Sequence, residues 1–103
     1  MSRFTLARGV RADLLDIWRL IAIEHHSPDA ADRTIDRITH ALAVLARQPF
    51  LGEAREDLAP GVRGFVVSPY LVLYTPREYG VRVIQIVHSA RDIRTAFRPP
   101  KGT

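Results

Sequence analysis

The N-terminal part of the chain changes from an alternating to a helical pattern of apolar residues. Residues 3–8 alternate weakly, with Phe4 and Leu6 on one side, as is typical of a short strand. From Val10 onward, apolar residues recur every three or four positions, and this spacing predicts an amphipathic helix over residues 10–24. The chain is therefore expected to begin with a strand that leads directly into a helix.

A second helix is predicted to start at Ser27-Pro28-Asp29. This sequence combines a capping hydroxyl, a proline suited to the first helical position and an acid at the positive end of the helix dipole. Helical spacing continues to about Arg47, and the helix is expected to end before Pro49. Because only about three residues separate the two helices, they are expected to form an antiparallel hairpin.

After the helices, the apolar period becomes two. Residues 49–61 contain two Pro and two Gly and are predicted to form a loop. Three alternating segments follow, and the short links between them predict an antiparallel meander. The predicted strands cover residues 62–67, 70–75 and 81–88, separated by Ser68-Pro69 and by a turn at residues 76–80.

These elements predict an α+β fold with the order β-αα-βββ, contained in a single domain over residues 1–97. A helix hairpin and a single sheet each have an apolar face to bury, so the two are expected to form two layers. The N-terminal strand is expected to join the same sheet as the meander. Residues 90–97 are expected to form one or two helical turns, and residues 98–103 a flexible tail.

Composition narrows the class of protein further. The 103 residues include no Cys, which excludes disulfides, thiolate chemistry and cysteine-based metal sites. Fifteen Lys+Arg against eleven Asp+Glu leave a net charge of +4, which favours an acidic partner but is too small to indicate nucleic-acid binding. No apolar stretch approaches the ~20 residues of a membrane-spanning helix, and the N-terminus lacks the apolar segment of a signal peptide. We therefore expect a cytoplasmic protein with no membrane partner.

The sequence contains no motif for a cofactor, a metal ion or a hydrolytic triad. The six Gly are scattered and form no phosphate-binding loop. His25 and His26 are adjacent, so they point in different directions and do not form the i, i+4 pair that shares a metal. Neither a cofactor nor a bound metal is expected.

Polar residues gather instead at the ends of the predicted strands. Arg63, Arg82, His88 and Arg91 are expected to form one basic patch. Such a patch suits two functions: gripping an RNA phosphate, with His or Arg as acid or charge stabiliser, or docking an acidic protein surface without chemistry. A purely structural interpretation is also open, in which Arg91 pairs with Asp92 and His88 binds backbone groups.

Four pieces of the sequence, in this order, resemble the ParE branch of the RelE/ParE toxin superfamily of bacterial type II toxin–antitoxin systems. The resemblance covers roughly residues 3–93. The four pieces are Leu6…Ala12-Asp13-Leu14…Ile17-Trp18, Pro49-Phe50-Leu51-Gly52…Arg55…Asp57-Leu58-Ala59-Pro60-Gly61-Val62-Arg63, Phe65…Tyr70-Leu71-Val72-Leu73-Tyr74 and Val83-Ile84-Gln85-Ile86-Val87-His88-Ser89-Ala90-Arg91-Asp92-Ile93.

The resemblance implies a toxin that is neutralised by a cognate antitoxin. ParE-like members poison DNA gyrase, whereas RelE-like members cut messenger RNA on the ribosome with basic sheet residues, often Lys, and a Tyr near the C-terminus. Here the sheet has no Lys and no Tyr follows Tyr79, so we expect a gyrase poison that is not an enzyme. Thr75 stands where ParE-like relatives often carry Arg. A ribosome-dependent endoribonuclease and a toxin-like binding module without toxicity are the alternatives.

The resemblance also suggests two surfaces. Arg63, His88, Arg91 and Asp92 are expected to shape the end that faces the target, together with residues 93–97. A ParD-like antitoxin is expected to bury apolar residues in a groove beside the helix hairpin. The residues expected to contact the antitoxin are Trp18, Ala22, Leu42 and Leu45. Sequence-specific nucleic-acid binding by the toxin itself is not expected.

Overall fold

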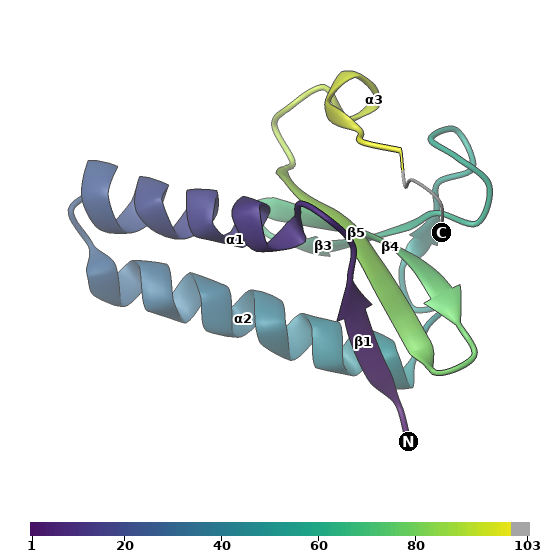
Figure 1. The fold of residues 1–103 in the computed structure, drawn as a ribbon. Coiled ribbons are helices and arrows are strands. Elements are labelled where there is room, and N and C mark those ends of the chain that lie inside the picture. Colours follow the sequence, from purple (N-terminus) through teal and green to yellow (C-terminus); the bar gives the residue numbers. More distant parts are fainter. Residues whose placement is uncertain (100–103) are drawn as a thin grey trace.

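The computed structural model describes residues 1–99 and has the predicted order of elements (Figure 1). An N-terminal strand leads into two helices, which are followed by the strands of the meander and a short C-terminal helix. The first helix continues as a π-helical turn, η1, before the chain reverses. The elements are β1 (Arg3–Leu6), α1 (Val10–Arg19), η1 (Leu20–Glu24), α2 (Pro28–Arg47), β2 (Glu53–Ala54), β3 (Arg63–Val67), β4 (Tyr70–Arg77), β5 (Gly80–His88) and α3 (Ile93–Ala96).

All five strands belong to one sheet with the order β1-β5-β4-β3-β2. The meander of β3, β4 and β5 is antiparallel, as predicted, and β1 joins its edge by pairing parallel to β5. The two-residue strand β2, which pairs with Arg63 and Gly64, lies in the segment predicted to be a loop. The sequence did not reveal β2 because two paired residues are too few to produce a period.

The helix hairpin packs on one face of the sheet and encloses the main core. The turn between the helices is capped by Ser27, whose Oγ accepts a hydrogen bond from the Ala30 N–H at 3.3 Å. Trp18 Nε1 donates to the Asp32 carboxylate at 2.8 Å and so links the two helices. This core lies between the helices and the sheet and includes Val10, Ile17, Ile38, Leu42, Leu45, Tyr70, Val72, Tyr74, Val81, Val83 and Ile86. The predicted two-layer α+β fold is confirmed.

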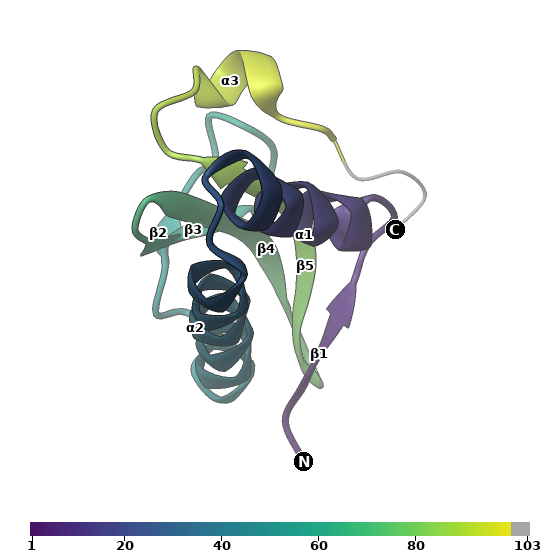
Figure 2. The ribbon, with the colours of Figure 1, turned by 90° about the vertical axis from the view of Figure 1, so that its left-hand side faces the viewer.

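The opposite face of the sheet is also covered, by the loop after β2 and by the C-terminal segment. This second core contains Val62, Leu71, Leu73, Ile84 and Val87, against which Leu58, Ala59, Ile93, Ala96 and Phe97 pack. Figures 1 and 2 show α3 on the side of the sheet away from α2. The sequence expectation of one buried sheet face was incomplete. The unbroken apolar run of β4, from Tyr70 to Tyr74, is typical of a strand buried on both faces.

A β-bulge interrupts the pairing of β4 with β5. Leu73 pairs with Gln85 and Tyr74 pairs with Val83, so Ile84 has no partner of its own. The additional residue changes which side of the sheet the following residues face. Val83 and Ile86 therefore both belong to the helix-side core, whereas Ile84 belongs to the second core. Gln85 is consequently directed at the C-terminal segment, to which it is bonded.

Candidate functional site

The basic residues predicted to form one patch lie at two opposite ends of the sheet. Arg63 pairs with Tyr74, and Arg82 pairs with Thr75, near the hairpin that joins β4 to β5. His88 pairs with Tyr70, at the start of β4. Tyr70 and Tyr74 are four positions apart, or about 13 Å along a strand. The prediction of a single patch was therefore wrong.

Arg63 is bound to the loop that follows α2. Its Nε donates to the Gly52 carbonyl at 2.9 Å, and its Nη2 donates to the carbonyls of Gly52 and Phe50 at 2.6 and 3.2 Å. The guanidinium also lies over the Phe50 ring, with Cζ 5.3 Å from the ring centroid. Arg63 therefore holds the loop and lies away from His88, contrary to its expected place at the target-facing end.

Tyr74 fastens the same loop from inside the core. Its hydroxyl donates to the Pro49 carbonyl at 2.8 Å and accepts from the Gly52 N–H at 2.9 Å. A Cβ at position 52 would lie 2.7 Å from this hydroxyl and from the Gly64 carbonyl oxygen, so only glycine fits there. The loop after α2 is thus fixed by Tyr74 and Arg63 together.

The other three predicted target-facing residues come together at the end of β5. The His88 ring packs edge-on against the Tyr70 ring, with the two ring centroids 5.4 Å apart. Its Nδ1 accepts a hydrogen bond from the Ala90 N–H at 3.1 Å. Asp92 caps α3 by accepting from the Thr95 hydroxyl at 2.9 Å and from the Thr95 N–H at 3.4 Å. The hydroxyl bond is the main cause that lowers the pKa of Asp92. Between them, Arg91 is exposed on the turn.

Beyond α3, the C-terminal segment is held by Gln85, a residue that the sequence analysis did not select. Its Nε2 donates to the Ala96 carbonyl at 2.8 Å, and its Oε1 accepts from the Arg98 N–H at 2.7 Å. Gln85 is 5% exposed and is the only buried polar residue among those that the structure describes. A polar residue within the apolar strand Val83–Val87 was the signal that could have identified it.

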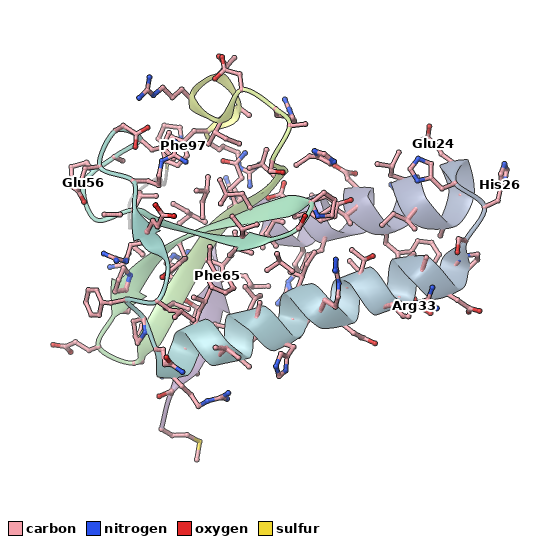
Figure 3. All side chains as sticks on the ribbon, turned by 180° about the vertical axis from the view of Figure 1, so that it is seen from behind. Glu24, His26, Arg33, Glu56, Phe65 and Phe97 are labelled. Atoms are coloured by element: carbon pink, nitrogen blue, oxygen red, sulfur yellow. The ribbon has the colours of Figure 1, made fainter. Side chains whose placement is uncertain are left out.

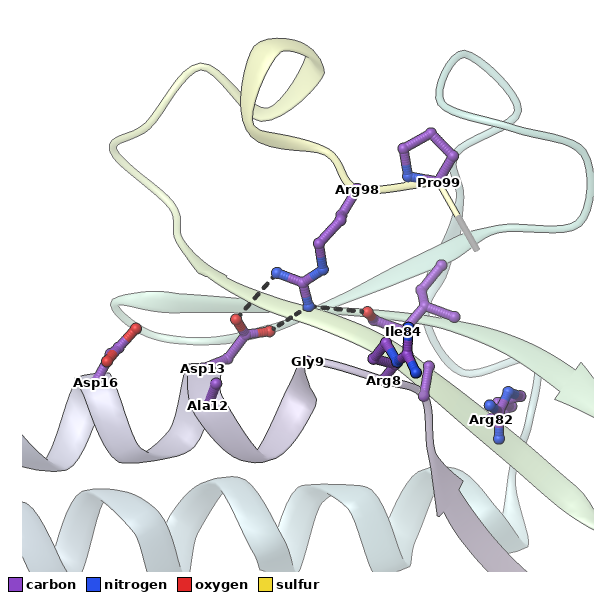
Figure 4. Close-up of a pocket in the computed structure, with 10 residues that line it drawn as sticks. Arg8, Gly9, Ala12, Asp13, Asp16, Arg82, Ile84, Arg98 and Pro99 are labelled. Atoms are coloured by element: carbon purple, nitrogen blue, oxygen red, sulfur yellow. Dashed lines mark hydrogen bonds and ion pairs between the residues drawn. The ribbon is translucent and has the colours of Figure 1, made fainter. Parts of the chain in front are cut away.

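Arg98 provides the second attachment, although residues 98–103 were predicted to form a flexible tail. Its Nη1 and Nη2 donate to Asp13 Oδ1 and Oδ2 at 3.1 and 2.9 Å (Figure 4). Asp13 Oδ2 also accepts from the Ile86 N–H at 3.1 Å. Gly9, with φ of 94°, makes room for this contact, because a Cβ there would lie 2.8 Å from Arg98 Nη2. The predicted tail beyond Pro99 lies outside the described residues.

A third attachment joins α3 to the loop over the second core. Asp57 accepts from Arg55 Nε at 3.0 Å and from Arg94 Nε at 3.2 Å. These bonds, chiefly the one from Arg55, hold the pKa of Asp57 well below its usual value. The polar end formed by His88, Arg91 and Asp92 is therefore connected to a C-terminal segment that is fixed at several points.

The residues predicted to contact an antitoxin occupy very different environments. Leu42 and Leu45 are 2% and 0% exposed, within the core between α2 and the sheet, and Ala22 is also buried. Leu42 and Leu45 cannot line an open groove in this structure, because their side of α2 faces the sheet. Trp18 remains partly exposed, and Leu15 and Ile23 on the same hairpin are 46% and 60% exposed.

The sequence model of the ParE toxin of the type II toxin–antitoxin system parDE matches residues 4–93. The chain belongs to the ParE toxin family. Among its ParE relatives, Toxin ParE3 of Caulobacter vibrioides is 33% identical over 93 residues, which cover 90% of this chain and 92% of that protein. Toxin ParE1 of Mycobacterium tuberculosis is 25% identical over 93 residues, or 89% and 94% of the two chains.

Comparison with solved structures agrees on the fold. A chain of the chromosomal ParDE TA system from P. aeruginosa superposes with a TM-score of 0.67 at 21% identity, covering 85% of this chain and 96% of that one. The ParE assignment and the α+β fold expected from the sequence are thus confirmed. By its family, this chain is a ParE toxin of a type II toxin–antitoxin system. None of the described helices is long and apolar enough to cross a membrane.

Proposed function

We propose that this ParE toxin inhibits DNA gyrase by binding to it, without catalysing a reaction, and that a ParD-like antitoxin neutralises it. The family membership supports the toxin role, and the ParDE name of the similar solved structure supports a ParD-like partner. The observation that carries the mode of action is the second face of the sheet. Its central positions are apolar and lie beneath the loop and the C-terminal segment.

This covered face disfavours the ribonuclease alternative. Cleaving RNA on the sheet would require cationic or acid–base side chains on an accessible face. One face is buried against the helices, and the centre of the other consists of Leu71, Leu73 and Ile84. The arginines near the hairpin of β4 and β5 lie apart from His88, so the predicted combination of arginine and histidine is not assembled.

The target-facing surface in this proposal consists of His88, Arg91 and Asp92 with the adjoining helix α3. Asp92 and His88 set the shape of the turn through their bonds to Thr95 and Ala90. Arg91 projects from that turn and is the charged group available to an acidic surface. Arg63 is left out, because it lies at the other end of the sheet and binds the loop after α2.

The antitoxin surface in this proposal lies on the outer side of the helix hairpin. Trp18 retains its expected role, and the exposed Leu15 and Ile23 replace the buried Leu42 and Leu45. An amphipathic segment of the antitoxin would cover these apolar side chains, as in helix-in-groove recognition. The net charge of +4 suits an acidic antitoxin segment.

A gyrase assay with purified proteins tests the target and the surface together. The toxin should block supercoiling and accumulate cleaved DNA, and the product of the neighbouring antitoxin gene should reverse both effects. His88→Ala combined with Arg91→Ala should weaken inhibition, whereas Arg33→Ala on α2 should not. No inhibition by the natural chain would contradict the gyrase target, and codon-specific cleavage of messenger RNA after induction would favour the ribonuclease. Full inhibition by the double variant would contradict the proposed surface.

A further inference from the structure

Three arginine side chains lie in a row at the β1 edge of the sheet, on the face opposite the helix hairpin. Because Phe4 packs in the helix-side core, its neighbours Arg3 and Thr5 face the other side. Arg82 on β5 pairs with Thr5, and its Nη1 donates to the Thr5 hydroxyl at 3.4 Å. Arg8 follows β1 and lines the same hollow as Arg82 (Figure 4). We call Arg3, Arg82 and Arg8 the arginine row.

Neighbouring side chains fix the positions of two members of this row. The hydroxyls of Thr5 and Tyr79 are hydrogen-bonded to each other at 2.7 Å. The Arg3 guanidinium lies over the Tyr79 ring, with Cζ 4.2 Å from the ring centroid. Arg82 is bonded to the same Thr5 hydroxyl. Since these side chains are already ordered, less conformational entropy is lost when a partner binds them.

The positive charge of the row is not neutralised by the acidic residues around it. In the part of the chain that the structure describes, none of the three guanidinium groups forms an ion pair. Asp13, in the hollow, is already bonded to Arg98. Asp16 lies at the opposite end of the hollow from the row (Figure 4), and Glu78 lies in the turn before β5. The row therefore presents an excess of positive charge.

The row offers charge without an apolar anchor. Arg3 and Arg8 are exposed, and Arg82 is half-buried. Apart from Met1, the large apolar side chains that are exposed in the described chain lie on the helix hairpin, on the loop after α2 and on β3. Protein interfaces depend on apolar or aromatic anchors at their centre. A row of accessible guanidinium groups therefore fits a polyanion better than a folded protein surface.

The length of the row and its aromatic neighbour favour duplex DNA as that polyanion. Arg3 and Arg8 are five positions apart, so the row extends over up to about 17 Å. Over this length, one strand of a DNA duplex carries about five phosphates. Single-stranded nucleic acids are held largely by bases that stack on open aromatic rings. Here one face of the Tyr79 ring is already occupied by Arg3.

We propose that the arginine row binds the phosphate backbone of duplex DNA, without reading its sequence. Each guanidinium group donates to phosphate oxygens, which its planar fork matches. The row lies at the start of β5, whereas the proposed target-facing surface lies beyond the end of that strand. DNA binding by the toxin alone therefore does not depend on the gyrase proposal, and either can fail without the other.

Fluorescence anisotropy with the full chain and a labelled duplex of about 20 base pairs, in the absence of gyrase and antitoxin, tests the proposal. The Kd should be about 10–100 µM at about 50 mM salt. Three phosphate contacts should give a slope of log K against log salt of about −2.7, so that raising the salt from about 50 to about 200 mM weakens binding about 40-fold. Two duplexes of unrelated sequence should bind equally.

Variants of the row show which charges are responsible. Arg3→Gln, Arg8→Gln and Arg82→Gln should each change the slope to about −1.8 and weaken binding at low salt about tenfold. Arg82→Lys keeps the charge and should keep the slope of the natural chain. Arg33→Gln removes the same net charge from α2, near the hairpin tip (Figure 3), and should leave the slope unchanged. Urea unfolding of each variant separates lost binding from lost folding.

Three results would overturn the proposal. The first is the absence of salt-dependent duplex binding by the folded natural chain. The second is the same slope in the three glutamine variants of the row as in Arg33→Gln, which would place binding elsewhere or reduce it to net charge. The third is tighter binding to single-stranded DNA of the same length, or to polyglutamate of the same charge, which would assign the row to a single strand or to an acidic protein segment.

Discussion

Arg98 and Asp13, which are 85 positions apart, form a two-point ion pair that joins the C-terminal segment to the first turn of α1. The Asp13 side chain is 14% exposed and also accepts from the backbone of β5. One carboxylate therefore connects a helix, a strand and the chain end. Together with Gln85, it determines where α3 and the adjoining polar end lie relative to the sheet.

Replacing Gln85 by Leu should loosen the C-terminal segment. The change removes both amide bonds to residues 96 and 98, and we expect a loss of about 1–2 kcal/mol in the free energy of unfolding. Hydrogen exchange should accelerate most over residues 93–98, and gyrase inhibition should fall while antitoxin binding remains. Gln48→Leu, at the exposed end of α2, is the control. Unchanged exchange over residues 93–98 in Gln85→Leu would contradict this role.

Removing the Tyr74 hydroxyl should destabilise the loop after α2. Tyr74→Phe keeps the ring in the core but leaves the Pro49 carbonyl and the Gly52 N–H without their partner. We expect the free energy of unfolding, measured with urea, to fall by about 1–2 kcal/mol, because buried groups lose their hydrogen bonds. Tyr79→Phe, near the start of β5, should cost less, since its hydroxyl bond to Thr5 is only partly buried. Equal losses would argue against a special role for Tyr74.

Stability should decrease on acidification through Asp57 and Asp92. The pKa of each is lowered in the folded chain, so the unfolded chain binds more protons as the pH falls. Their stabilising contribution is complete above the unfolded value near 3.8 and is lost as the pH falls through the folded pKa. The free energy of unfolding of the natural chain and of the double variant Asp57→Asn/Asp92→Asn should be measured with urea at pH 7 and at pH 3. The difference between the two proteins should be smaller at pH 3.

The control for this experiment is Asp36→Asn, on the exposed side of α2. Its effect on stability should vary less between the two pH values. If the double variant were less stable than the natural chain by the same free energy of unfolding at pH 3 as at pH 7, these two carboxylates would not be responsible for the acid sensitivity.

Antitoxin binding and core stability should be separable on the helix hairpin. Trp18→Ala should weaken antitoxin binding more than it affects folding, because the ring is only partly buried. Leu42→Ala should lower the free energy of unfolding by about 2–5 kcal/mol, because it leaves a cavity in the core. Calorimetric titration with the antitoxin, combined with urea unfolding, distinguishes the two. Normal antitoxin affinity in Trp18→Ala would remove this residue from the interface.

The helices and the meander could be predicted because their periods extend over many residues. Ser27-Pro28-Asp29 correctly marked the start of α2, and the alternation after Gly61 correctly marked β3. The second core was missed because it depends on which segments return to the sheet, which no local period records. The buried run Tyr70–Tyr74 was the only local sign that both faces of β4 are covered.

The prediction of a single basic patch was wrong for a different reason. The directions of the strands alone place its residues at opposite ends of the sheet. In a meander the first and third strands run the same way, so Arg63 at the start of β3 and His88 at the end of β5 must lie at opposite ends. Leu42 and Leu45 were misassigned because periodicity identifies an apolar face of a helix but not what covers it. Gln85 and Asp13 could not be selected without knowing the path of the C-terminal segment.

At the bulge at Ile84, β5 can become one residue shorter without changing which face of the sheet its other side chains point to. Ile84 and Gln85 both face the second side of the sheet, so deleting Ile84 would leave Val83, Gln85 and Ile86 on their present sides. A deletion three residues earlier, at Val81, would instead move the start of the strand out of phase with β1 and β4. Natural variation in the length of this strand among ParE toxins should therefore be concentrated at the bulge. There, the loss of one residue leaves the flanking side chains on the same faces of the sheet.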